Sequence, residues 1–280
     1  MLKSLPLICT QIGCGFFECT IKIGESWLRW MNFGPSYASR NRTVNDIFRE
    51  QLPVSFQLGV IALAIAIAIG MPLGIMSALN HNEWPDYLGM GVAIFGVSVP
   101  TIVLGPLLVW FFGVLLQWLP PTGWGAKPPF VLGLFPSTLG WEYFKYAVLP
   151  AFVLGFGSSA VIARLTRASM LQVIREDYIR TARSKGLRER MVVMRHAFRN
   201  ALIPVVTVLG PLFAALVTGT FVTELVFGIP GLGKYFVTSI SNRDYPVIMG
   251  TILLYAVFLV VSNLLVDILY AVLDPRIRYN

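Results

Sequence analysis

Charged residues are scarce in this sequence. Asp, Glu, Lys and Arg make up 13% of its 280 residues, whereas 56% are hydrophobic. A soluble domain of this length needs more polar surface than that, and an intrinsically disordered chain would be far less apolar. With a mean hydropathy of +0.70, the composition excludes both classes and indicates a membrane protein.

Cysteine and histidine, the residues of many metal and catalytic sites, are also rare. The three cysteines, Cys9, Cys14 and Cys19, have a spacing that fits neither a zinc site nor a complete disulfide framework, so free thiols are expected. The two histidines, His81 and His196, stand apart and are expected on the surface. Neither H-E-x-x-H nor G-x-S-x-G occurs, which argues against a membrane-embedded hydrolase. We therefore expect no catalytic residues, no metal site and no cofactor.

Long hydrophobic runs are what the sequence has in abundance. A membrane-spanning helix needs about 20 mostly apolar residues. Five segments meet this requirement: 54–79, 87–117, 146–170, 201–226 and 247–273. They predict an all-α polytopic membrane protein with about five spans, preceded by an N-terminal segment over residues 1–52.

The basic residues predict the orientation of these spans. Ten of the 22 Lys and Arg residues lie between Arg164 and Arg199, which marks that loop as cytoplasmic. By alternation the loops 118–145 and 227–246 are external, and each carries two basic residues. The N-terminal segment fits less well, because it should be external and is also basic. The net charge of +8 thus reflects membrane topology and gives no reason to expect nucleic acid as a partner.

The stretch GIPGLGKY, residues 228–235, is nearly a phosphate-binding loop. It matches G-x-x-x-x-G-K-[ST] except at Tyr235, where the magnesium-binding hydroxyl is missing. It also follows a predicted span on the external side, where there is no cytoplasmic ATP. We expect a glycine-proline turn at Pro230, Gly231 and Gly233 that closes one helix and starts a short external one.

The basic loop itself predicts two short amphipathic helices. Acidic residues at Glu176 and Asp177 start the first helix, and Gly186 ends it. The second has an apolar stripe made of Met191, Val192, Met194 and Phe198. From the pattern alone, this loop either rests on anionic lipid headgroups or docks into a soluble partner.

Four ionisable residues lie within or at the ends of the predicted spans and are candidate polar contacts in the membrane: Arg164, Arg167, Glu224 and Asp267. Asp267 and the two arginines are expected at the same depth, which favours a structural ion pair over a substrate contact. For Glu224, an interface hydrogen bond and a position lining a transport path remain equal alternatives.

Several motifs resemble one family. Residues 178–187, YIRTARSKGL, are similar to the cytoplasmic "EAA" motif of permease subunits of bacterial binding-protein-dependent ABC importers. The triplet is Arg180-Thr181-Ala182, without the family's acid, and Gly186 takes the place of the motif's glycine. Further similar stretches follow in order: FGPS at 33–36, EXXXXXPGLG at 224–233, NRDYP at 242–246 and DPRIRY at 274–279. They resemble the B-type permease of the oligopeptide, dipeptide and nickel branch.

The resemblance implies a type I importer transmembrane domain over residues 53–280, in the bacterial inner membrane, with a coupling loop at 171–200. Six spans are the family expectation, whereas the residues here support five. The residues implied to couple to an ATPase are Asp177, Tyr178, Arg180, Thr181, Ala182, Lys185 and Gly186. Implied partners are a second homologous permease, two cytoplasmic ATPase subunits that hydrolyse the ATP, an extracytoplasmic substrate-binding protein and membrane lipid.

Two alternatives stay open at this point. Peptides are the expected cargo, with nickel complexes or glutathione as alternative cargoes. A secondary, ion-coupled transporter is the alternative mechanism. Such transporters need internal repeats and coupling-ion sites near the bilayer midplane, and the predicted spans show no repeat and few charges.

Overall fold

The computed structural model describes residues 33–39, 41–126, 130, 134, 136 and 140–273, together with the backbone of three short strands before them. Strands β1 (Ile8–Cys9), β2 (Cys19–Ile23) and β3 (Ser26–Trp30) form an antiparallel sheet in the order β1-β2-β3. The sequence analysis did not predict this sheet. The cysteine side chains lie outside the described part, so their expected free thiols stay a prediction.

The longest helix, α1 (Val44–Leu79), begins ten residues before the predicted span. Thr43 caps it: its side chain accepts a hydrogen bond from the Asp46 N–H, and the Asp46 carboxylate accepts one from the Thr43 N–H. This reciprocal capping box satisfies backbone donors that a helix start leaves unpaired. The helix therefore extends beyond its membrane-spanning part into a polar first turn.

The second predicted span, 87–117, is broken. Helix α2 (Trp84–Ser98) is followed by α3 (Thr101–Leu108) and the π-helical η1 (Val109–Leu115), and the two halves meet at an angle of 99°. Val99 takes an extended conformation at the break, because the ring of Pro100 disfavours a helical residue before it. The segment predicted as a span from 87 to 117 is thus made of two helical pieces that together can count as one bent span.

The remaining elements are α4 (Trp141–Ile174), α5 (Asp177–Ser184), α6 (Glu189–Met191), η2 (Val192–Ala197), α7 (Phe198–Val217), α8 (Phe221–Val226), α9 (Leu232–Ser241) and α10 (Tyr245–Leu273). Within the described residues, four helices are long and apolar enough to cross a membrane, and five if the bent pair counts as one span. This confirms the predicted all-α spanning architecture.

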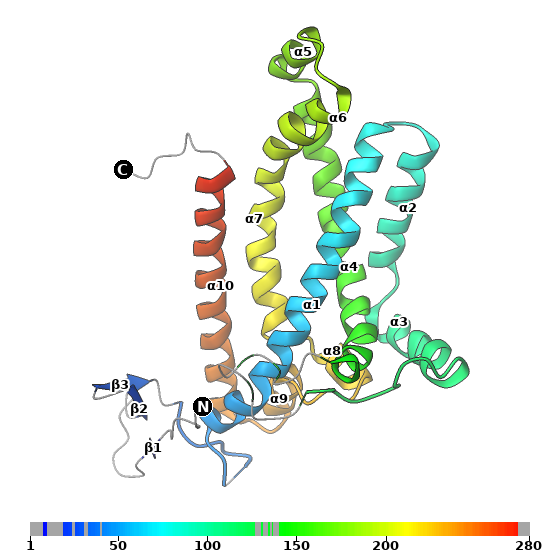
Figure 1. Cartoon of the computed structure of the whole chain (residues 1–280). Helices are drawn as coiled ribbons and strands as arrows, with labels where there is room; N and C mark the ends of the chain where they lie inside the picture. The colour runs from blue at the N-terminus through cyan, green and yellow to red at the C-terminus, as the bar shows by residue number, and fades with distance from the viewer. Residues whose placement is uncertain are drawn as a thin grey trace.

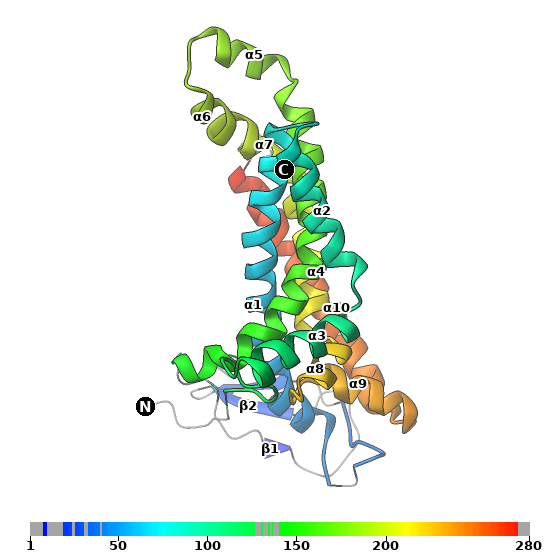
Figure 2. The ribbon, with the colours of Figure 1, turned by 90° about the vertical axis from the view of Figure 1, so that its right-hand side faces the viewer.

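The long helices form a bundle with distinct ends (Figures 1 and 2). Helices α5 and α6 project at one end, here called the α5 end. Helices α3, α8 and α9 lie across the opposite end, here called the α9 end. The predicted loops thus fall on opposite ends, as alternating spans require.

Close contact between α1 and α4 holds the bundle together. A Cβ placed on Gly155 would come within 2.6 Å of the Ala62 carbonyl oxygen, and one on Gly70 within 2.6 Å of that of Ser159. Small residues allow such backbone approach, which is how helices gain packing energy when lipid supplies no hydrophobic drive.

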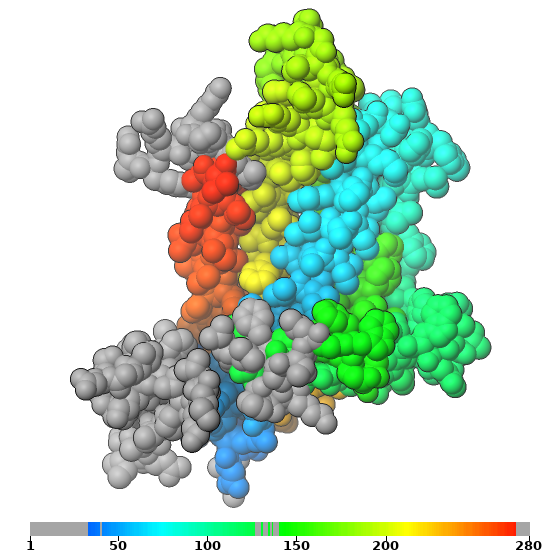
Figure 3. Space-filling model, viewed as in Figure 1, coloured from blue at the N-terminus to red at the C-terminus, as the bar shows by residue number. Residues whose placement is uncertain are grey.

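Helix α10 lies at the edge of the bundle, packed chiefly on α7 (Figures 1 and 3). Only 11% of its most apolar 18-residue window is buried inside the chain, although that window has a mean hydropathy of 2.5. Most of its apolar surface therefore faces outward, toward lipid or other subunits.

Candidate functional site

Helix α5 packs against the rest of the chain through apolar side chains. Ile179 is fully buried and Ala182 is 7% exposed, and both pack in a cluster with Met170, Val192 and Ala197. Ala182, one of the residues implied to couple to an ATPase, therefore turns its side chain toward its own bundle.

The opposite face of α5 is polar and open. Asp177, Tyr178, Arg180, Thr181 and Lys185 are all exposed. Tyr178 is held in place by a hydrogen bond that the Asn200 amide donates to its hydroxyl oxygen at 2.7 Å. The helix therefore offers a positioned polar face with exposed basic groups, of which Arg180 pairs with Asp177 at 3.5 Å.

The turn after α5 depends on Gly186, which has φ +74°. Residues that carry a Cβ adopt this conformation only at a free-energy cost, whereas glycine does not. Across the turn, Arg183 donates to Glu189 at 2.7 Å, and this pairing raises the pKa of the Arg183 guanidinium. Glycine and ion pair together fix the direction in which α5 projects.

The apolar stripe predicted for the second short helix is divided in the structure. Val192 is buried, whereas Met191 and Met194 are 43% and 50% exposed. Phe198 is half-buried and packs against the internal cluster. Part of the stripe thus supports α5 from inside, and two methionines remain on the surface.

An ion pair that the sequence analysis missed lies near the α5 end. Arg167 on α4 donates from Nε to Asp86 Oδ1 at 2.7 Å and from its terminal nitrogen to Oδ2 at 2.6 Å. The Asp86 side chain is 3% exposed. The same arginine donates to His81 Nδ1 at 3.0 Å, so this nitrogen acts as an acceptor and does not also donate to Asp86, which lies farther away at 3.4 Å.

This cluster corrects one prediction, because Arg167 pairs with Asp86 instead of Asp267. His81 is exposed, as expected, and also contacts Arg167. Arg164 and Asp267 are both exposed, on α4 and α10. The only sequence signal for Asp86 was an acid in the first turn of a helix, which is common at any helix start.

Two motifs that are 200 residues apart in sequence meet at the α9 end. The Asp244 carboxylate accepts hydrogen bonds from the Ser36 hydroxyl, the Tyr37 N–H at 3.1 Å and the Ala38 N–H at 3.2 Å. Burial alone would raise the pKa of Asp244, but these hydrogen bonds outweigh it and lower the pKa. The FGPS and NRDYP stretches thus form one structural unit that joins the start of α1 to the start of α10.

Glu224, also at the α9 end, is completely buried. Its Oε1 accepts a hydrogen bond from the Ser55 hydroxyl at 2.7 Å, and Oε2 accepts one from the Lys234 N–H at 2.9 Å. The Ser55 oxygen in turn accepts the Leu232 N–H at 2.8 Å. Of the two equal alternatives for Glu224, these contacts inside the chain favour a hydrogen-bonding role over a position that lines a path.

The glycine-proline stretch lies between α8 and α9, without the strand that precedes a phosphate-binding loop. Gly228 has φ +61°, and Gly231 is the N-cap of α9. Gly231 and Gly233 surround the Glu224 carboxylate: a Cβ on Gly231 would come within 2.3 Å of Glu224 Cδ. Pro230 is exposed beside them.

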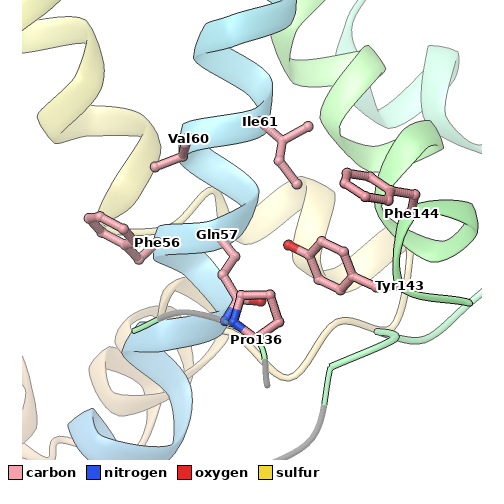
Figure 4. Close-up of a pocket in the computed structure, with 7 residues that line it drawn as sticks. All are labelled: Phe56, Gln57, Val60, Ile61, Pro136, Tyr143 and Phe144. Atoms are coloured by element: carbon pink, nitrogen blue, oxygen red, sulfur yellow. The ribbon is translucent and has the colours of Figure 1, made fainter. Parts of the chain in front are cut away.

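A small apolar cavity of about 190 Å³ lies between α1 and the start of α4 (Figure 4). Phe56, Val60, Tyr143 and Phe144 are among its walls. The one amide in the wall, Gln57, is already engaged, because it donates to the Leu134 carbonyl and accepts from the Trp124 indole. The cavity therefore offers mainly apolar contacts, and the other side-chain polar group among its lining residues is the Tyr143 hydroxyl. Among the described residues, no cluster of three metal-ligand side chains occurs.

Comparisons with known proteins agree with this architecture. Residues 70–279 match the family described as "Binding-protein-dependent transport system inner membrane component". The chain is 46% identical over 249 residues to the dipeptide transport system permease protein DppB of Bacillus subtilis, covering 89% of this chain and 75% of that protein. It is 41% identical to the oligopeptide transport system permease protein OppB of Salmonella typhimurium, covering 89% and 76%. It is 44% identical to the glutathione transport system permease protein GsiC of Pectobacterium atrosepticum, again covering 89% and 76%.

Solved structures share the fold. An inward-facing MetNI methionine ABC transporter matches with a TM-score of 0.62 at 15% identity, covering 80% of this chain and 94% of that one. An amino acid ABC transporter matches with a TM-score of 0.56 at 17% identity, covering 80% and 93%. The family match spans three quarters of the sequence, and the chain belongs to the binding-protein-dependent transport system inner membrane components.

Proposed function

We propose that this chain is one of two permease subunits that form the path of a peptide importer in the bacterial inner membrane. Members of its family are membrane subunits without enzyme activity of their own, and ATP hydrolysis belongs to partner subunits. Peptides are the favoured cargo because relatives at 46% and 41% identity are named as dipeptide and oligopeptide permeases.

In this proposal the α5 end is cytoplasmic. The segment from Arg164 to Arg199, which contains α5, α6 and η2, carries ten of the 22 basic residues. Such a concentration favours retention on the inner side of the membrane. The α9 end then faces outward, where a substrate-binding protein delivers the cargo to the turn at Pro230, Gly231 and Gly233.

The single observation that carries the coupling role is the two-sided environment of α5. Its inner face, Ile179 and Ala182, is packed into the bundle, while its outer face is exposed. A force applied to the outer face would therefore be transmitted to α4 and η2 instead of merely bending a loose loop. Exposed Arg180 and Lys185 suit an acidic groove on an ATPase subunit, where complementary charge sets rate and specificity.

The remaining partners follow from the same assembly. A second homologous permease would cover apolar surface that is now open, and lipid would cover the rest. Two ATPase subunits would each receive one coupling helix. The coupling loop assigned to residues 171–200 corresponds to the segment from the end of α4 to the first turn of α7.

Three alternatives are kept. The relative at 44% identity is named as a glutathione permease, and glutathione is itself a small peptide, so it is the nearest alternative cargo. Nickel complexes are less favoured because no relative reported above is named for nickel. An ion-coupled transporter is disfavoured by the family match.

Charge reversal on α5 tests the coupling role. We expect Arg180→Glu combined with Lys185→Glu to reduce ATPase subunit co-purification and ATP-dependent peptide uptake by at least about tenfold, since like charges brought together at an interface cost several kcal/mol. Arg49→Glu is the matched control, because Arg49 is exposed at the other end of the bundle. Equal retention of the ATPase and equal uptake by both variants would contradict the role of α5.

The cargo is tested separately with proteoliposomes that contain the whole importer. A labelled dipeptide, a tetrapeptide, glutathione and a nickel chelate are offered together with the importer's substrate-binding protein. Uptake of the nickel chelate alone would overturn the peptide assignment. Uptake that continues without ATP but stops when the proton gradient is dissipated would instead favour the ion-coupled alternative.

A further inference from the structure

The near-match to a phosphate-binding loop at residues 228–235 has a physical counterpart in the structure. The turn surrounds an acidic group, the carboxyl group of the chain's own Glu224. Glu224 is fully buried, and the first backbone N–H groups of α9 point at it. The Lys234 N–H lies 2.9 Å from Oε2, and the Gly233 backbone donates to the same carboxylate.

The glycines of the turn make room for this carboxylate. A Cβ on Gly231 would lie 2.3 Å from Glu224 Cδ, and one on Gly233 would lie 3.1 Å from Oε2. A side chain at Gly231 could not coexist with the carboxylate in its present place. A helix start with exposed N–H groups and no Cβ in the way has the features that bind phosphate or carboxylate in other proteins.

Ser55 connects this anion site to the spanning helix α1. The Leu232 N–H donates to the Ser55 oxygen, which leaves the Ser55 hydroxyl hydrogen to donate to Glu224 Oε1. The Ser55 hydroxyl and the Lys234 N–H thus donate to one carboxylate oxygen each. Helices α1, α8 and α9 are therefore tied together at a single buried group.

We propose that the turn at residues 228–235 is an anion-binding site for a carboxylate, occupied internally by Glu224, and that Glu224 and Ser55 are positioning residues that hold α9 in register with α1. If Glu224 is removed, the same site should accept a small external carboxylate such as formate. The consequence for transport rests on the proposed function, because it requires α9 to form part of the outward-facing surface.

The test uses the assembled importer and sodium formate as the probe. We expect Glu224→Ala to lower the Tm by about 4 °C or more, because several hydrogen bonds to a charged group are lost. Formate should raise the Tm of this variant in a saturable manner and leave wild type unchanged at the same ionic strength. Sodium chloride at matched concentration controls for salt.

Two matched variants separate this site from general destabilisation. Gly231→Ala places a methyl group where the carboxylate lies, so formate should not restore the Tm of this variant. Ser55→Ala removes a hydroxyl and leaves Glu224 in place, so formate should not restore the Tm of this variant either. Glu224→Gln keeps the shape and covers the case in which Glu224→Ala fails to assemble. A Gln variant with wild-type Tm would overturn the requirement for an anion.

The outcomes also distinguish this proposal from the proposed function. Formate that raises the Tm of all variants equally would show an adventitious ion only and would overturn the site. If formate restores the Tm of Glu224→Ala while no peptide is transported by wild type, the anion site stands and the peptide assignment fails. If formate restores the Tm and peptide uptake of Glu224→Ala and of no other variant, the result supports both the anion site and the proposed function.

Discussion

The guanidinium of Arg167 makes two parallel hydrogen bonds to the carboxylate of Asp86, at 2.7 and 2.6 Å, and thereby joins α4 to the first turn of α2. Both oxygens of the acid are engaged by one arginine, and the acid is almost inaccessible to solvent. Planar, two-point pairing of this kind is stronger and more directional than a single contact.

Removing the arginine should therefore destabilise the bundle. We expect Arg167→Met to lower the free energy of unfolding by about 3 kcal/mol, because a buried carboxylate loses its counter-charge. Arg167→Lys should recover only part of this, since an ammonium group does not reproduce the planar fork. The measurement is thermal unfolding of the purified protein in detergent.

Arg164→Met is the control for that experiment, because Arg164 lies on the same helix and is exposed. The double variant Arg167→Met with Asp86→Leu should be more stable than Arg167→Met alone, since no uncompensated charge remains. Equal losses for Arg164→Met and Arg167→Met would show that the pairing with Asp86 is unimportant.

Close packing of α1 on α4 yields a second prediction. Gly155→Ala should destabilise the protein by roughly 1–3 kcal/mol, because the new methyl group would lie 2.6 Å from the Ala62 carbonyl oxygen and force the helices apart. Gly91→Ala is the matched control: no atom lies within 4 Å of the added methyl group, and the residue is in helix α2. This variant should be neutral or slightly stabilising. The comparison fails if both alanines have the same effect on Tm.

The contact between Ser36 and Asp244 predicts a pH dependence. The hydrogen bonds lower the pKa of Asp244 below its ordinary value of 3.8. A lowered folded-state pKa contributes stability that is complete above the ordinary pKa and is lost as the pH falls through the folded pKa. Between pH 5 and 8 the contribution should therefore be constant.

This dependence is measured as the difference in Tm between wild type and Asp244→Asn across pH 3 to 8. The difference should be flat from pH 8 to 5 and shrink toward pH 3, because the Asp244 carboxyl is then protonated more readily in the unfolded chain than in the folded protein. A difference that first shrinks between pH 7 and 5 would mean that the pKa of Asp244 is raised instead.

Membrane orientation is a fourth prediction. A reporter enzyme that is active only outside the cytoplasm should be inactive when fused after Lys185 and active when fused after Lys234. Lys185 ends α5 and Lys234 lies in the first turn of α9, at opposite ends of the bundle. The reverse pattern would overturn the positive-inside assignment and the proposed cytoplasmic role of α5.

Much of the fold follows from the sequence because the bilayer imposes strong one-dimensional rules. Each crossing needs a long apolar run, and all backbone groups within it must be paired inside the helix. Runs such as 54–79 and 247–273 therefore predict α1 and α10 directly. The amphipathic pattern around Gly186 likewise predicts two short helices, since helix starts and ends have local signals.

The contacts between helices were decided only by the tertiary structure. Hydropathy gives the depth of a residue in the bilayer but not the direction in which it faces, so Asp267 was as plausible a partner for Arg167 as Asp86. The burial of Glu224 within the turn of residues 228–235 depends in the same way on a neighbour from a distant segment, Ser55 on α1. Apolar length and basic residues thus determined which segments cross the membrane and in which orientation they are expected. The rotation of each helix and its distance from its neighbours determined which polar groups meet. These two properties depend on side chains that are far apart in the sequence and pack together in the folded chain.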